Sequence, residues 1–185
     1  MKNLLAYVES VREMLNEVDI PYDGTAYVVV NNRLRRPWGV CKRMTKPNGK
    51  RGFIIEINKC LVDERNSDKG LIETLLHEYI HTCKDCFDHG ETWKHYVDIV
   101  NKRFNLNVRE RDTFEGKGIS QEYIEEKNKN CWAVKCTGCG YVWYKDRISN
   151  FVKYPERYMH KGCSGKNGKL IRIQNKPGCV ILKAI

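Results

Sequence analysis

The segment Leu71-Ile-Glu-Thr-Leu-Leu-His77-Glu78-Tyr-Ile-His81 is the most informative part of the chain. Its apolar residues recur at steps of four, which predicts a buried helix over residues 71–82. His77 and His81 are four residues apart and therefore project from one face of that helix. Two unpaired imidazoles are costly in an otherwise apolar helix, so we interpret the pair as metal ligands.

Glu78 follows the first histidine and lies about 100° further round the helix, beside a metal without being forced to ligate it. A bound Zn²⁺ lowers the pKa of water toward about 7, and a neighbouring carboxylate can take the proton as the water attacks a carbonyl. The same carboxylate can then pass the proton to the leaving amine. The segment therefore predicts a zinc hydrolase with Glu78 as its general base.

A catalytic zinc needs a third protein ligand and an open fourth position. His89 is the preferred third ligand, because Gly90 allows a sharp turn that can bring it back over the helix. Glu91 and His95 are the alternatives.

The flanking segments predict an α+β fold with a small antiparallel sheet packed on helices. Apolar residues at alternating steps of four and three predict a helix over residues 3–18, and a similar pattern predicts another over 91–104. Strands are expected at 25–30, 38–44 and 52–58, with a turn at 46–49. We expect one domain over residues 1–106, a polar linker over 107–130, carrying at most a short helix, and a second domain over 131–185.

The helix motif, read as Leu75-Leu76-His77-Glu78-x-x-His81 and followed by His89-Gly90, resembles the SprT-like family, the Spartan-type zinc metallopeptidases. The resemblance covers about residues 1–105, including Trp38-Gly39-Val40-Cys41, Ile54–Asn58 and Leu61. It implies a zincin-like fold, a Glu78 base and zinc ligands at His77, His81 and His89. It also implies DNA-dependent cleavage of proteins crosslinked to DNA.

A second constellation is Cys136-x-x-Cys139 followed by His160-x-x-Cys163. Two such pairs about twenty residues apart match a structural zinc ribbon, which many bacterial members of the family carry at the C-terminus. The segment has few aliphatic residues, so zinc would supply much of its folding free energy. Cys131 or Cys179 could replace His160 as a ligand.

Cysteine usage indicates a reducing compartment. The chain has nine cysteines, an odd number that does not suit a disulfide framework. The N-terminus does not resemble a signal peptide, and no apolar stretch is long enough to span a bilayer. We therefore expect a cytoplasmic protein, nucleoid-associated if bacterial, that is neither secreted nor membrane-bound. Cys83 and Cys86 are interpreted as plain thiols, with a third metal site including Cys41 or Cys60 as the alternative.

The whole net charge of +10 lies in residues 129–185, and a second basic block lies within the otherwise neutral remainder of the chain. Residues 129–185 contain 12 basic and 2 acidic side chains, and residues 33–51 contain eight basic and none acidic. In the C-terminal part the basic residues alternate with aromatic ones, a composition suited to single-stranded nucleic acid. DNA, single-stranded or at a junction, is therefore the expected partner. The candidate contacts are Arg33, Arg35, Arg36, Lys42, Arg43, Lys145, Arg147, Lys153 and Arg157.

Together these patterns predict a zinc endopeptidase, with one catalytic and one structural Zn²⁺, that cuts protein held near DNA. The alternative is a non-catalytic, zinc-containing nucleic-acid-binding or regulatory protein. The sequence does not determine the oligomeric state.

Overall fold

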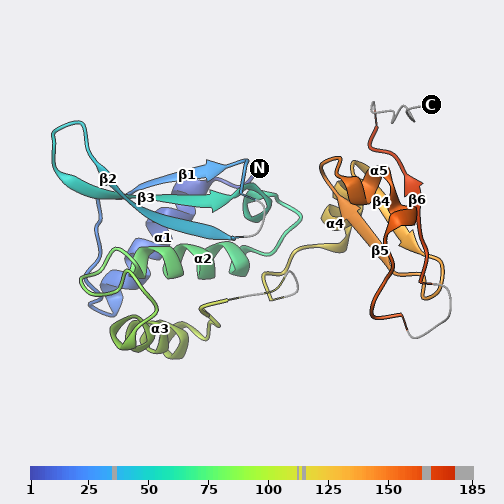
Figure 1. Cartoon of the computed structure of the whole chain (residues 1–185). Helices are drawn as coiled ribbons and strands as arrows, with labels where there is room; N and C mark the ends of the chain where they lie inside the picture. Colours follow the sequence, from blue (N-terminus) through green and yellow to red (C-terminus); the bar gives the residue numbers. More distant parts are fainter. Residues whose placement is uncertain (35–36, 112, 114–115, 164–167, 178–185) are drawn as a thin grey trace. The chain divides into compact units, whose positions relative to one another are not determined.

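The computed structural model describes residues 1–34, 37–111, 113, 116–163 and 168–177. The chain forms two compact units, Met1–Ser120 and Gln121–Ile185 (Figure 1). Both combine small sheets with helices, so the α+β prediction is confirmed. The first unit contains α1 (Leu4–Glu17), β1 (Tyr27–Asn31), β2 (Gly39–Thr45), β3 (Arg51–Asn58), the 3-10 turn η1 (Lys59–Val62), α2 (Asp68–Ile80) and α3 (Glu91–Phe104).

The first unit's sheet has the strand order β1-β3-β2 and is mixed, which corrects the prediction of an antiparallel sheet. β2 and β3 form an antiparallel hairpin whose turn is closed by the Gly49 N–H donating to the Lys46 carbonyl, 2.9 Å. β1 pairs with the other edge of β3 and runs parallel to it, because the chain crosses from one edge of the sheet to the other before β2. β2 is consequently an edge strand.

Helix α2 lies at the centre of the first unit, below the sheet in Figure 1. It packs against β2 and β3 and also against α1 and α3. Ser67 caps its N-terminus by accepting a hydrogen bond from the Lys69 N–H. Because α2 has neighbours on several sides, it is buried on most of its faces, and its buried residues include Glu73, Thr74 and Glu78. Its fully buried apolar residues are Leu71, Leu75, Leu76, Tyr79 and Ile80.

The second unit is built on an antiparallel sheet of order β5-β4-β6. Its core is small: Trp132, Val134, Cys136, Val152 and Leu170 are the buried members. The elements are α4 (Gln121–Lys129), β4 (Trp132–Cys136), β5 (Val142–Lys145), α5 (Asn150–Lys153), η2 (Pro155–Arg157) and β6 (Leu170–Gln174).

The residues predicted to form a linker, 107–130, are instead divided between the two units. In the first unit, Val108 and Ile119 are buried, and Lys117 is only 4% exposed. Residues 121–129 form α4 of the second unit. Several polar groups of this segment hydrogen-bond to the first unit, including the Asn107 N–H to Glu73 and the Ser120 N–H to Asn66. Within the described ranges, no helix has the length and apolar character needed to cross a bilayer.

Candidate metal centres

The three predicted histidine ligands meet at the C-terminal end of α2. His77 lies in the last turn of the helix and His81 is its C-cap, while His89 comes from the loop that leads to α3. Nε2 of His77 is 3.1 Å from Nε2 of His81 and 3.2 Å from Nε2 of His89. The structure thus brings these three nitrogens to one point.

The hydrogen bonds behind two of the rings determine which nitrogen faces that point. Nδ1 of His77 is 2.9 Å from the Arg109 carbonyl, and Nδ1 of His81 is 2.7 Å from the Cys86 carbonyl. A carbonyl only accepts hydrogen bonds, so both Nδ1 atoms must carry the proton. Burial, reinforced by the neighbouring His81, lowers the pKa of His77 to about 3, so the ring is neutral. Nε2 lone pairs therefore face one another, an arrangement that suits a bound cation such as zinc.

Trp93 of α3 forms one wall of the histidine group. Its ring stacks on His81 with an interplanar angle of 22° and meets His77 and His89 edge-on. The side chain is 2% exposed. The helical pattern of residues 91–104 puts Trp93 on the apolar side of α3, but nothing in the sequence indicated that it packs against the histidine group.

Glu78 is 5% exposed and lies beside the histidine group on α2. Burial raises the pKa of Glu78 to about 8, although the Cys41 backbone N–H and Lys117 both favour the carboxylate. Gly39, at the start of β2, is so close to Glu78 that a side chain at that position would collide with it. A buried carboxyl group that titrates near neutral pH can both take and release a proton.

A cavity of about 570 Å³ opens beside Glu78 and His77. Its described lining comes from residues 37–39, from α2, and from Arg109, Glu110, Arg111 and Lys117. These last four residues belong to the segment predicted as a linker, and no motif in the sequence marked them as part of the site. The signal was weak, because they follow α3 without any motif of their own.

The alternative third ligands lie elsewhere. Glu91 is at the N-terminus of α3, with its side chain 96% exposed and 3.5 Å from the Lys94 ammonium. His95 is also exposed on α3, next to Tyr96. Neither belongs to a candidate metal group within the described residues, whereas His89 does.

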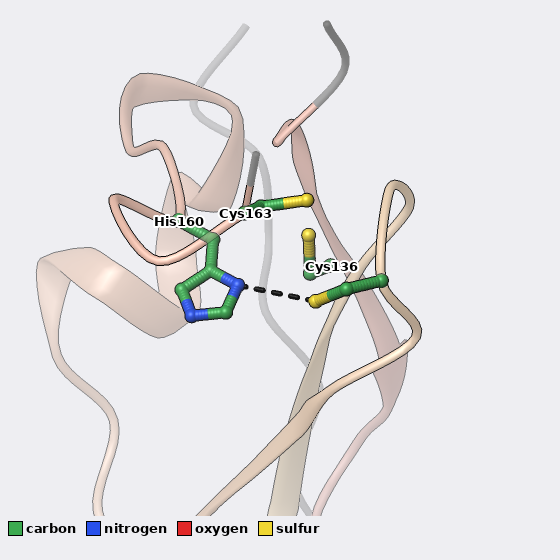
Figure 2. Close-up of side chains that lie close together, drawn as sticks. Cys136, His160 and Cys163 are labelled. Carbon is green, nitrogen blue, oxygen red and sulfur yellow. Dashed lines mark hydrogen bonds between the residues drawn. The ribbon is translucent and has the colours of Figure 1, made fainter. Parts of the chain in front are cut away.

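The second predicted ligand group also comes together, in the second unit. One donor atom each from Cys136, Cys139, His160 and Cys163 lies within 4.8 Å of the others. Figure 2 shows the Cys136, His160 and Cys163 side chains converging from separate stretches of chain. Sγ of Cys139 is 3.2 Å from Nδ1 of His160. Three sulfurs and one imidazole are a donor set that zinc accepts in tetrahedral sites.

The backbone around Cys136 favours a thiolate. Backbone N–H groups of Cys139 and Gly138 point at its sulfur and lower the pKa of the Cys136 thiol to about 6. Gly140 closes this turn with a left-handed backbone (φ 77°) that suits glycine. The turn therefore presents a deprotonated sulfur near neutral pH, the form that binds metal.

The remaining cysteines lie outside both groups where they are described. Burial raises the pKa of the Cys83 thiol to about 12, and Cys86 is fully buried beside it. The Cys131 thiol donates to Asp146 and to the Lys127 carbonyl, so it does not take the place of His160. Cys179, the other possible replacement, lies outside the described residues.

The predicted nucleic-acid contacts are spread over both units. On β2, Lys42 pairs with Glu56 at 2.7 Å, whereas Arg43 lies over the Phe87 ring at 4.2 Å. Arg33 is exposed, and Arg35 and Arg36 lie outside the described residues. Four more are exposed on the second unit: Lys145, Arg147, Lys153 and Arg157.

Residues 10–112 match the family model described as the SprT-like family. The matched range contains the three histidines, Glu78 and Glu110, and ends before the second unit begins. None of the curated proteins compared with the chain matches it.

Proposed function

Because the chain belongs to the SprT-like family, we propose that it is a zinc-dependent endopeptidase acting on DNA-associated proteins, with Glu78 as its general base. The observation that carries this proposal is the convergence of the His77, His81 and His89 Nε2 atoms beside the buried Glu78 carboxyl group. Family membership alone supports a metallopeptidase; the geometry adds which residues would carry the reaction.

Each group has a defined task in this proposal. Zinc held by the three nitrogens would supply a Lewis acid that activates water and polarises the scissile carbonyl. Glu78 takes the proton of the attacking water and passes it to the leaving amine. The carbonyls of Arg109 and Cys86 hold the rings of His77 and His81 in the tautomer that leaves Nε2 free for metal.

The second unit is proposed as a zinc-stabilised module that binds DNA. Its exposed basic residues, among them Lys145, Arg147, Lys153 and Arg157, suit contact with phosphates, and its exposed aromatic rings suit stacking with bases. Tyr141, Tyr144 and Tyr158 are 57%, 44% and 39% exposed. Holding enzyme and substrate on one DNA molecule raises their local concentration, so the peptidase needs little sequence preference of its own.

The test is a cleavage assay with full-length protein and a protein substrate crosslinked to single-stranded DNA. We expect cleavage that needs metal, stops with a chelator and weakens steeply with salt. Glu78→Gln should lose about 100-fold or more of the activity while keeping its metal. Glu91→Gln, a matched change at an exposed carboxylate, should behave as wild type.

Two results would contradict the proposal. Undiminished cleavage by Glu78→Gln would exclude Glu78 as the base. A wild-type chain that binds metal and DNA but cleaves no crosslinked substrate would favour the non-catalytic, DNA-binding alternative.

A further inference from the structure

The three histidines differ in what lies behind their rings. His77 and His81 each face a backbone carbonyl through Nδ1. His89 instead faces a side chain, with its Nδ1 atom 3.8 Å from Oε1 of Glu110. His89 is also on a loop rather than on α2, and its side chain is 32% exposed. His89 is therefore the one ring of the three whose Nδ1 atom faces no backbone carbonyl among the described residues. Its orientation depends most on a neighbouring side chain.

Glu110 belongs to a segment whose path is firmly fixed. We define residues 107–111 as the return segment, since they lead back from the end of α3 to the site. The Asn101 side chain clamps Val108, accepting from its N–H at 2.7 Å and donating to its carbonyl at 3.0 Å. The Asn107 N–H donates to the buried Glu73 carboxylate, 2.8 Å. Glu110 follows two residues after this clamp, so its backbone is held beside His89.

The only other ion pair of Glu110 within the described residues is weak. Oε1 of Glu110 is 3.8 Å from Nε of Arg111, whose side chain is 92% exposed. Such exposed pairs contribute little and do not fix a side chain. The distance to His89 exceeds a typical N–H···O length by about 0.9 Å. The Glu110 side chain is 50% exposed, so packing does not lock it at that distance.

We propose that Glu110 is a positioning residue for His89, accepting a hydrogen bond from its Nδ1–H and holding its Nε2 toward His77 and His81. A carboxylate in this position fixes the tautomer and makes the imidazole a better metal donor. With the Arg109 carbonyl behind His77, two consecutive residues of the return segment then support two of the three ligands. This inference rests on the proposed metal site at the three histidines.

The experiment measures Co²⁺ affinity of the full-length chain by competition with a chelator. Cobalt at the cysteine-containing group adds sulfur-to-metal charge-transfer absorption, so the two groups are distinguished by their spectra. Glu110→Ala should weaken binding at the histidine group by about 10- to 100-fold, and Glu110→Gln, which keeps an acceptor oxygen, by less. Arg111→Ala is the matched control and should stay within about twofold of wild type.

The outcomes separate this inference from the proposed function. Equal affinity of Glu110→Ala and wild type would overturn the role of Glu110 alone. No cobalt at the histidine group of the wild-type chain would overturn the proposed function as well. The thermal unfolding of the metal-stripped chain should be the same for Glu110→Ala and wild type. A lowered unfolding temperature, or weaker binding at both groups, would assign Glu110 to the fold and contradict the proposal.

Discussion

Gly39 and Glu78 lie so close together that a Cβ atom added at Gly39 would be 2.6 Å from Oε1 and 2.7 Å from Cγ of Glu78. Both the end and the middle of the glutamate side chain are within this collision distance. The carboxyl group is buried, so it has little free space into which it can retreat. The absence of a side chain at Gly39 therefore leaves the space that the Glu78 side chain, the proposed general base, occupies.

Replacing this glycine should move the base without removing it. We expect Gly39→Ala to lower peptidase activity by about 100-fold, the effect of a displacement near 1 Å. Metal content should be unchanged, because the three atoms nearest to the added Cβ all belong to Glu78 and not to a histidine. The measurement is the cleavage rate together with metal analysis.

Gly24→Ala is the matched control for that change. Its Cβ would meet only a ring carbon of Tyr22 at 3.7 Å, an ordinary contact. Equal activities of the two alanine variants would show that Glu78 does not depend on Gly39.

The sequence singled out the residues that come together in the two candidate metal groups, because the information is local. The spacing of His77 and His81 follows from helix periodicity, and the ends of α3 coincide with the predicted bounds, Glu91–Phe104. The Cys136-x-x-Cys139 turn is likewise a short-range pattern. None of these needed knowledge of which distant segments meet.

What could not be predicted depends on contacts between distant segments. The partner of the His77 ring is a backbone carbonyl of Arg109, and a carbonyl has no signature in the sequence. The parallel pairing of β1 with β3 depends on where the chain crosses the sheet. The polar composition of residues 107–120 is typical of a linker. The sequence does not show that a polar side chain such as Lys117 is buried here against Glu73.

Gly70→Ala tests how closely residues 117–118 pack on α2. Alanine usually favours a helix over glycine by about 1 kcal/mol. At Gly70, however, the Cβ would lie 2.2 Å from the Lys117 carbonyl oxygen, which is backbone and cannot rotate away. We expect the first unit to lose about 1–3 kcal/mol in its free energy of unfolding. Urea unfolding, followed by signals of the first unit, measures this change.

The control is Lys69→Ala, one residue away on the exposed side of the helix. The Lys69 side chain is 54% exposed and lies 3.8 Å from Glu73, which is buried and also contacts Lys117 and the Asn107 N–H. Loss of the Lys69 side chain should therefore cost less than about 1 kcal/mol. Stabilisation by Gly70→Ala would mean that residues 117–118 do not pack against α2.

Removing a cysteine of the second unit should unfold that unit and spare the first. Cys136 is both a proposed ligand and a member of the small core. With so few buried residues, we expect the unit to depend on metal for its stability. We expect Cys136→Ser to lower the metal content from two ions per chain to one, and the second unit's amide NMR signals to collapse into the unfolded range.

Cys131→Ser is the matched control, because serine can replace its hydrogen bonds to Asp146 and the Lys127 carbonyl. It should keep both metal ions and a folded spectrum. A Cys136→Ser protein that retains two ions would contradict the proposed second centre.

The ion pair between Asp63 and Arg65 stabilises the first unit by an amount that decreases at acid pH. The Arg65 side chain, donating to both carboxylate oxygens at 2.8 and 2.9 Å, lowers the pKa of Asp63 to about 2. An unfolded aspartate titrates near 3.9, so the unfolded state binds more protons between about pH 4 and pH 2. The contribution is therefore complete above about pH 4 and is lost as the pH falls through about 2.

Asp63→Asn should destabilise the first unit by about 1 kcal/mol at pH 6. This difference from wild type should shrink as the pH falls from about 4 toward 2, as measured by urea unfolding at each pH. Comparison at each pH cancels the acid effects that both proteins share, including loss of metal.

The control is Asp98→Asn, at an exposed position of α3 with no ion pair among the described residues. It should lower the free energy of unfolding at pH 6 by less than Asp63→Asn does. A wild-type advantage that stays constant down to pH 2 would show that the Asp63 carboxylate contributes nothing through its charge.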